Sequence, residues 1–316
     1  MTIRVRVPGS LMLMGEHAVL HGELALVLAT NTYIEVTLNA RSDRQVFIDS
    51  ALAQYQSSLD ELVADPKLSF VLAAINLHHA QLRCGFDLHI QSEFSHTVGL
   101  GSSAAVTAGV VAALSRLCNE TLNAEQLFDR SLAAVHQVQG GRGSGSDLVA
   151  SIYGGIVAYR VAPREIRRLD KAAILNMPPV DLFYVGYKRA TPEVIAIVDQ
   201  LSTQAPELFK QLYLLMGQTA EVAEQAILSQ DWALLGQLMN SYAGLLDALG
   251  VCDIKLADLQ YRLRQSQTVL GAKISGSGLG DSVIALGQVA PETIDYLNIP
   301  VAVSPQGLEI VGDAHE

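Results

Sequence analysis

The first third of the chain alternates between apolar and polar positions, which is the period of a half-buried β-strand. Residues 3–7, IRVRV, alternate strictly and run into Pro8-Gly9, where we expect the strand to end. Residues 25–40, ALVLATNTYIEVTLNA, are rich in β-branched side chains and predict one or two strands. Residues 86–94, FDLHIQSEF, alternate again and predict a further strand.

A helical pattern follows these strands. Residues 104–118 are apolar on every side as far as Arg116, which predicts a helix buried on all faces. The basic residue near its end suits the negative pole of the helix dipole. Residues 124–138 predict a second helix, and a polar, charged stretch at 160–171, RVAPREIRRLDK, then interrupts the pattern. We expect a domain boundary in this stretch.

The second half of the chain begins with helices. Thr191-Pro192-Glu193 has the composition of a helix start, with a capping residue, a proline in the first turn and an acidic residue after it. We expect helices from there to Leu249, with Gly250 as a C-terminal cap.

Strands return towards the C-terminus. Residues 269–274, VLGAKI, and 281–287, DSVIALG, predict two strands around a glycine-rich turn, and residues 301–310, VAVSPQGLEI, predict a strand pair. Because runs of strands and runs of helices occur in both halves, the sequence predicts an α+β protein. Its two domains are expected to cover residues 1–165 and 166–316.

Composition narrows the class of protein. Half of the 316 residues are hydrophobic, which is enough for a large core and argues against global disorder. The net charge of −11 argues against nucleic acid or an anionic membrane as the main partner. A phosphorylated small molecule stays compatible with this charge, because local dipoles dominate inside a binding site.

The N-terminus, the length of the apolar runs and the cysteines indicate where the protein is located. The N-terminal residues, MTIRVRVPGS, contain no apolar run of the signal-peptide type. The longest apolar run, 104–114, is shorter than the roughly 20 residues that a membrane span needs. Cys84, Cys118 and Cys252 make neither a disulfide framework nor a zinc pattern, and we expect them to be small core residues. The sequence thus predicts a cytoplasmic protein, either a monomer or a homodimer.

Three glycine-rich clusters carry the candidate chemistry: GLGSSAA at 99–105, GGRGSGSD at 140–147 and SGSGLGD at 275–281. A glycine-rich turn that opens a helix leaves main-chain N–H groups and a positive pole available to an anion, and phosphate suits such a site. Ser102 and Ser103 are placed to cap the helix or to reach a phosphate-bound Mg²⁺. The alternative is a helix cap with ordinary turns. Neither GxxxxGK[ST] nor GxGxxG is present.

Together these segments resemble a known family. PGSLMLMGEHAVLHG at 8–22, GLGSSAA, and GAKISGSGLGDS at 271–282 are similar, in this order, to the three motifs of the GHMP small-molecule kinases. Mevalonate kinases are the most similar group, and LLDALGV at 245–251 adds to the likeness. The resemblance implies an N-terminal domain like the second domain of ribosomal protein S5 and a ferredoxin-like C-terminal α+β domain. ATP, Mg²⁺ and a small-molecule substrate are expected between them.

The resemblance also implies residue roles. Asp147 would be the catalytic base beside the acceptor hydroxyl, although an Asx turn or a helix cap is the structural alternative. Ser102 and Ser103 would coordinate Mg²⁺. The nucleotide phosphates would be bound by Gly99, Leu100, Gly101, Ser102, Ser103, Ala104, Gly276, Ser277 and Gly278. The substrate would be bound by Glu16, His17, Ser144, Gly145 and Asp147.

Three positions depart from the family pattern. Ser10 stands where the first motif usually has a lysine near the transferring phosphate. His136 replaces the metal-binding glutamate, and an imidazole is a poor ligand for Mg²⁺. Ser95-His96 replaces a common Pro-Gly pair. The cations that could substitute for the lysine, each otherwise expected to be a solvated surface charge, are Lys188, Arg189, Lys273 and Arg142.

The expected activity is ATP-dependent phosphorylation of the mevalonate hydroxyl, a step towards isoprenoid precursors. Residues 139–155, QGGRGSGSDLVASIYGG, and Asp281 look more like phosphomevalonate kinases, so phosphomevalonate is the second candidate acceptor. Other sugars or alcohols come third. The missing lysine and glutamate also allow a different class, an ATP-binding sensor without catalysis.

Overall fold

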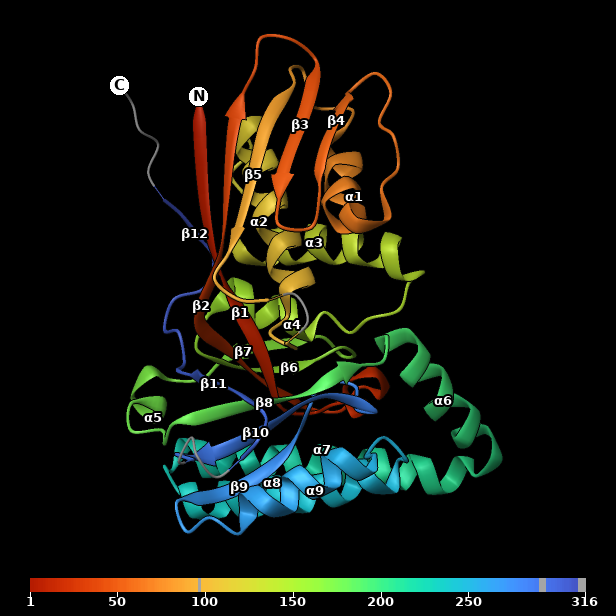
Figure 1. The fold of residues 1–316 in the computed structure, drawn as a ribbon, viewed down its shortest axis with the longest axis vertical. Helices are drawn as coiled ribbons and strands as arrows, with labels where there is room; N and C mark the ends of the chain where they lie inside the picture. The colour runs from red at the N-terminus through yellow and green to blue at the C-terminus, as the bar shows by residue number, and fades with distance from the viewer. Residues whose placement is uncertain (96–97, 290–293, 312–316) are drawn as a thin grey trace.

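The computed structural model describes residues 1–95, 98–289 and 294–311 and is built on two β-sheets (Figure 1). The first sheet has eight strands and the second has four. The strands of the first sheet are β1 (Thr2–Met14), β2 (Ala25–Ala40), β3 (Gln45–Ser50), β4 (Gln54–Ser58), β5 (Phe86–Ser92), β6 (Ile156–Arg160), β7 (Glu165–Arg168) and β12 (Glu309–Ile310). Those of the second are β8 (Val180–Lys188), β9 (Val269–Ser275), β10 (Gly280–Gly287) and β11 (Leu297–Val301).

The helices divide between the two sheets. α2 (Ser102–Leu117) and α4 (Ser146–Tyr153) pack on the first sheet, and α1 (Ser69–His78) and α3 (Ala124–Gln139) pack against α2. The second sheet is covered by α8 (Trp232–Ala248) and α9 (Ile254–Arg264) (Figure 1). The remaining helices are α5 (Lys171–Ile174), α6 (Thr191–Gln204) and α7 (Pro206–Leu228). Within the described chain no helix is long and apolar enough to cross a bilayer.

The predicted helix starts and ends are largely confirmed. α6 begins at Thr191 with Pro192 in its first turn, but Ala190 rather than Thr191 is the capping residue. α8 ends at Ala248, and Gly250 follows with φ of 80°, as expected of a C-terminal glycine.

The first strand continues past the point where the sequence pattern predicts its end. β1 runs to Met14, and its pairing with β2 shifts between Pro8 and Ser10. Proline has no N–H for the ladder, yet the strand continues past it, opposite a bulge whose extra residues, 30–32, lie in β2. The prediction of a strand end at Pro8-Gly9 is therefore wrong. The bulge places Ser10 in the middle of a buried strand, at 0% exposure.

The second sheet has the order β11-β8-β10-β9 with antiparallel neighbours throughout. Its first strand in sequence thus lies between its third and fourth, an arrangement that fits the expected ferredoxin-like domain. The predicted strand pair at residues 301–310 is wrong, because β11 joins this sheet and β12 pairs with β1. The predicted division at residues 165/166 falls inside β7, whose hairpin with β6 belongs to the first sheet.

The buried helix predicted at 104–118 is confirmed as α2, which packs on β1 and β2. Gly109 sets the spacing: a Cβ there would lie 2.8 Å from Val36 Cγ2 and 3.0 Å from Val7 Cγ2. α2 can thus lie directly on the sheet, which fixes the position of its N-terminus.

Candidate active site

The first glycine cluster forms the turn that opens α2. Gly99 and Gly101 have φ of 73° and 64°, a region that glycine enters at little cost. No side chain caps the helix, because Ser102 and Ser103 lie inside its first turn, and their predicted capping role is wrong. Among the described residues, the backbone amides of 99–104 donate to no acceptor. This turn therefore has the donors and the positive pole of an anion site.

Ser10 connects this turn to the candidate base. Its amide donates to the Leu100 carbonyl at 3.1 Å, and its Oγ donates to Asp147 Oδ1 at 2.9 Å. A Cβ on Gly101 would lie only 2.0 Å from Ser10 Oγ, so residue 101 must be glycine for the serine to stay where it is. The small residue in place of the family lysine thus orients a carboxylate.

Asp147 lies in the first turn of α4, just after Gly145, whose φ is 79°. Burial raises the pKa of its carboxyl, and the Ser10 hydrogen bond and the Lys188 ammonium partly oppose that shift. The carboxylate of Asp281 adds to the rise in the pKa of Asp147. A carboxylate with a raised pKa is a better proton acceptor at neutral pH.

The rest of the second cluster is held by the helix and strand on either side. His136, on α3, donates from Nε2 to the Gly143 carbonyl at 3.0 Å, and the Tyr159 hydroxyl donates to the Ser144 carbonyl. The position where the resemblance implies a metal-binding glutamate therefore has a loop-anchoring role here. Ser144 and Gly145, the predicted substrate residues, immediately precede α4.

The third cluster lies between β9 and β10 and packs on the segment after α8. Gly276 and Gly278 have φ of 105° and 83°. A Cβ on Gly278 would lie 2.4 Å from the Val251 carbonyl oxygen, which also accepts a hydrogen bond from the Leu279 amide at 2.8 Å. Ser277 Oγ is buried and has no partner among the described residues. Its hydroxyl is therefore available to a ligand.

The first and third motifs meet at His17. This residue adopts φ of 59°, and its Nε2 donates to the Ser277 carbonyl at 2.8 Å. Burial lowers the pKa of the imidazole, which favours the neutral ring. His17 thus joins the turn after β1 to the glycine loop of the second sheet.

Glu16 is buried in an ion pair. Its Oε1 pairs with the Lys273 ammonium, and Oε2 is buried without a partner among the described residues. Burial raises the pKa of Glu16 and lowers that of Lys273, and each charge opposes the shift of the other. Tyr242 closes the cluster, since its hydroxyl accepts from the Gly15 amide at 3.0 Å and donates to the Glu16 carbonyl at 3.2 Å.

The expectation of a surface position for Lys273 is wrong, because its side chain is 0% exposed. Lys188 is 34% exposed and forms an ion pair with the buried Asp281 at 2.7 Å. Sequence reasoning did not include Asp281 or Tyr242 among the site residues. The signal in the sequence was an aspartate at the end of a glycine-rich turn, but only strand pairing shows its partner.

The oxygen atoms near the first turn fit a hard cation. Within residues 1–95, 98–289 and 294–311, no three His, Cys, Asp or Glu side chains form a metal cluster. Ser102 and Ser103 place hydroxyls at the start of α2, and a nucleotide would supply phosphate oxygens there. This donor set suits Mg²⁺ shared with a nucleotide rather than a metal held by protein alone. His96, one of the departures from the family pattern, lies outside the described residues.

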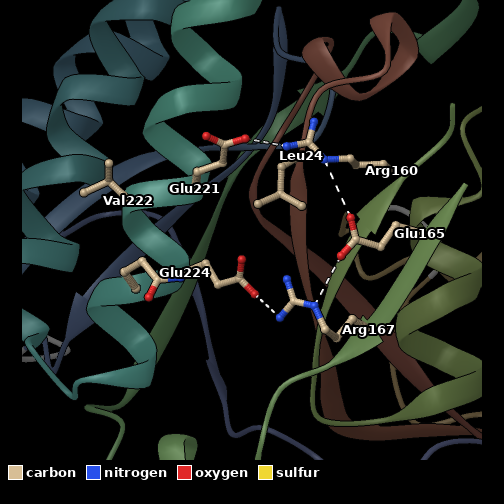
Figure 2. Close-up of a pocket in the computed structure, with 8 residues that line it drawn as sticks. Leu24, Arg160, Glu165, Arg167, Glu221, Val222 and Glu224 are labelled. Carbon is tan, nitrogen blue, oxygen red and sulfur yellow. Dashed lines mark hydrogen bonds and ion pairs between the residues drawn. The ribbon is translucent and has the colours of Figure 1, made fainter. Parts of the chain in front are cut away.

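The cavity of about 450 Å³ in Figure 2 lies elsewhere, between the β6–β7 hairpin and α7. Charged side chains that already pair with one another line it: Arg160 with Glu221 and Glu165, and Arg167 with Glu165 and Glu224. Since its charges are paired within the protein, we interpret it as a contact between the two sheets' domains and not as the active site.

Comparison with known proteins agrees with the geometry. Residues 69–155 match the GHMP kinases N terminal domain, and residues 223–299 match the GHMP kinases C terminal model. The mevalonate kinase of Thermococcus gammatolerans is 32% identical over 314 residues, covering 92% of this chain and 90% of the relative.

Two solved structures show the same fold. The Lin0012 protein from Listeria innocua superposes with a TM-score of 0.84 at 21% identity, covering 98% of this chain and 99% of that protein. The L. major mevalonate kinase in complex with R-mevalonate has a TM-score of 0.76 at 24% identity, and 96% of each chain is covered. The chain belongs to the GHMP kinases and is therefore an enzyme that uses ATP to phosphorylate a small molecule.

Proposed function

We propose that the chain is a mevalonate kinase, which converts mevalonate and ATP to phosphomevalonate and ADP. The observation that carries the proposal is the hydrogen bond from Ser10 to Asp147 beside the open first turn of α2. It holds a half-buried carboxylate through Ser10, whose own amide bonds to Leu100 in the turn where main-chain amides can bind phosphate. The relatives at about 30% identity over most of the chain are named mevalonate kinases, which supports mevalonate as the acceptor.

The proposed reaction uses each part of the site once. Asp147 accepts the proton of the acceptor hydroxyl while the hydroxyl oxygen forms a bond to the γ-phosphorus. The bond from the γ-phosphorus to the β,γ-bridging oxygen breaks, and ADP leaves with the electron pair. The amides of 99–104 and the loop with Gly276, Ser277 and Gly278 bind the phosphates. Bound Mg²⁺, near Ser102 and Ser103, would neutralise phosphate charge.

The acceptor would lie near Asp147, Ser144 and Gly145, within reach of the turn that contains Glu16 and His17. Because Glu16 is already paired with Lys273, its buried Oε2 is the oxygen left for a substrate hydroxyl. We propose the cytoplasm as the place of action, where ATP is abundant, and leave monomer or homodimer as the predicted states.

A coupled ADP assay tests the proposal. Purified protein, ATP and Mg²⁺ are combined in parallel with mevalonate, phosphomevalonate, galactose or homoserine. We expect kcat/KM for mevalonate to exceed the others by at least about tenfold, or ~1.4 kcal/mol of transition-state binding. Phosphorus NMR should show a new phosphomonoester. Faster turnover of phosphomevalonate or of a sugar would refute the assignment of the acceptor.

A further inference from the structure

A lysine and an aspartate from neighbouring strands form an ion pair beside the phosphate-binding loops. Lys188 ends β8 and lies opposite Gly280 of β10. The pairing shifts between Gly280 and Ser282: Asp281 alone lies opposite residues 185–187, so the extra residues of this bulge belong to β8, and Asp281 has φ of 73°. Bulges re-aim side chains, and a non-glycine residue at positive φ is a strained conformation that functional sites often retain.

The carboxylate of Asp281 lies between two of the glycine clusters. Its Oδ1 lies 2.5 Å from where a Cβ on Gly99 would be, and its Oδ2 lies 2.8 Å from the corresponding point on Gly276. The residue is 1% exposed, so a cation is needed to offset the cost of burying its charge. Lys188 supplies that cation at 2.7 Å.

The ammonium of Lys188 has further donors to offer. It carries three N–H groups and its side chain is 34% exposed, so the ion pair with Asp281 leaves part of it open to a ligand. Its charge also acts on the Asp147 carboxylate. Of the other candidate cations, the buried Lys273 is paired with Glu16, and Arg142 and Arg189 have exposed side chains.

We propose that Lys188 contacts the phosphoryl group that is transferred, and that Asp281 is the positioning residue that holds its ammonium beside the first glycine turn. The inference rests on the proposed function for the reaction and extends it. As the bond from the acceptor oxygen to the γ-phosphorus forms and the bond to ADP breaks, negative charge spreads over the phosphoryl oxygens. A fixed ammonium stabilises that charge without reorganising. The second sheet thus supplies the cation that Ser10 of the first sheet does not.

The first test compares Lys188→Met with Lys210→Met, a control of equal charge change at an exposed position on α7. For Lys188→Met we expect kcat to fall about 100-fold or more, with the KM for the acceptor within about threefold. We also expect ATP binding to weaken more than ADP binding, measured by calorimetry without acceptor. The control should match the wild type. Equal loss for ATP and ADP, or a kcat within a fewfold, refutes the contact.

The second test separates contact from folding, because Lys188→Met leaves the Asp281 carboxylate buried and unpaired. In the double variant Lys188→Met/Asp281→Asn, the buried charge is gone, so we expect the Tm to recover while kcat stays low. Lys188→Arg should restore at least about tenfold of the lost kcat. Recovery of both Tm and kcat in the double variant would show that the pair is only structural. The nucleotide measurements need no acceptor, so they stand even if mevalonate is not the substrate.

Discussion

Replacing Asp147 by asparagine isolates proton acceptance from geometry. The asparagine side chain would still offer an amide oxygen to the Ser10 hydroxyl, which now donates to Asp147 Oδ1 at 2.9 Å, so the turn should keep its shape. Only the capacity to accept the proton of the acceptor hydroxyl is lost. General-base assistance accounts for about 10²- to 10⁴-fold in rate, equivalent to ~2.7–5.5 kcal/mol of activation free energy.

The effect on stability should have the opposite sign. Burial raises the folded-state pKa of Asp147 above its ordinary value near 3.8. The stability that this group contributes is therefore fully present below the unfolded-state pKa and is lost as the pH rises through the folded-state value. At pH 7–8 the ionised carboxylate is a cost to folding, which asparagine removes. Asp147→Asn should thus have an equal or higher Tm than the wild type.

The assay measures kcat by coupled ADP release, ATP affinity by calorimetry and Tm by thermal unfolding, with Asp258→Asn on α9 as an exposed control. We expect kcat to fall at least about 100-fold, ATP affinity to stay within about threefold and Tm to hold or rise. The wild-type kcat should fall as the pH drops through the raised pKa of Asp147. A variant that keeps its activity within a fewfold would refute the base assignment, and a parallel loss of Tm would indicate a structural role.

Two further variants test the loop and the contact between the domains. Gly101→Val places a Cβ 2.0 Å from Ser10 Oγ. The φ of 64° at this residue adds about 1–2 kcal/mol of backbone strain for a side chain with a Cβ. We expect ATP binding, measured by calorimetry, to weaken at least about tenfold. Unchanged affinity in a folded protein would contradict the loop assignment. Arg167→Met leaves the Glu224 carboxylate, which is 6% exposed, without its partner. Because Arg167 is 48% exposed and solvent screens the pair, the free energy of urea unfolding should fall by only about 1–2 kcal/mol. We expect kcat to stay unchanged. A fall in kcat without loss of stability would place Arg167 in the active site instead.

Local patterns in the sequence were sufficient for much of the fold. α2 was predicted because an apolar stretch of helical length followed a glycine turn, and β2 because residues 25–40 are rich in β-branched side chains. The strand end predicted at Pro8 failed because the rule for proline is local. Whether a strand stops or bulges there depends on its partner β2, which the sequence pattern does not reveal.

For the site, too, local sequence patterns do not reveal which distant residues become partners. The glycine clusters could be found from composition and spacing, since each carries its chemistry within a few residues, whereas Asp147 was assigned as the base through the resemblance to the family. The ion pairs of Lys273 with Glu16 and of Lys188 with Asp281 join residues 257 and 93 positions apart. Such pairs follow from strand register and from bulges, so a sequence pattern identifies the charges and leaves their partners open.

The placement of charge also makes the reaction depend on how the two sheets lie against each other. The candidate base belongs to α4 on the first sheet, whereas Lys188, the cation that lowers its pKa, belongs to β8 of the second. Several buried contacts cross between them, among them the ion pair of Glu16 with Lys273 and the hydrogen bond from His17 to the Ser277 carbonyl. Because a displacement of about 1 Å between reacting groups can cost two orders of magnitude in rate, these contacts have a catalytic consequence without needing to touch the phosphates. A buried ion pair adds little net stability, but it requires a well-defined geometry. The pair of Glu16 with Lys273 is therefore suited to fixing the position of the base relative to the cation.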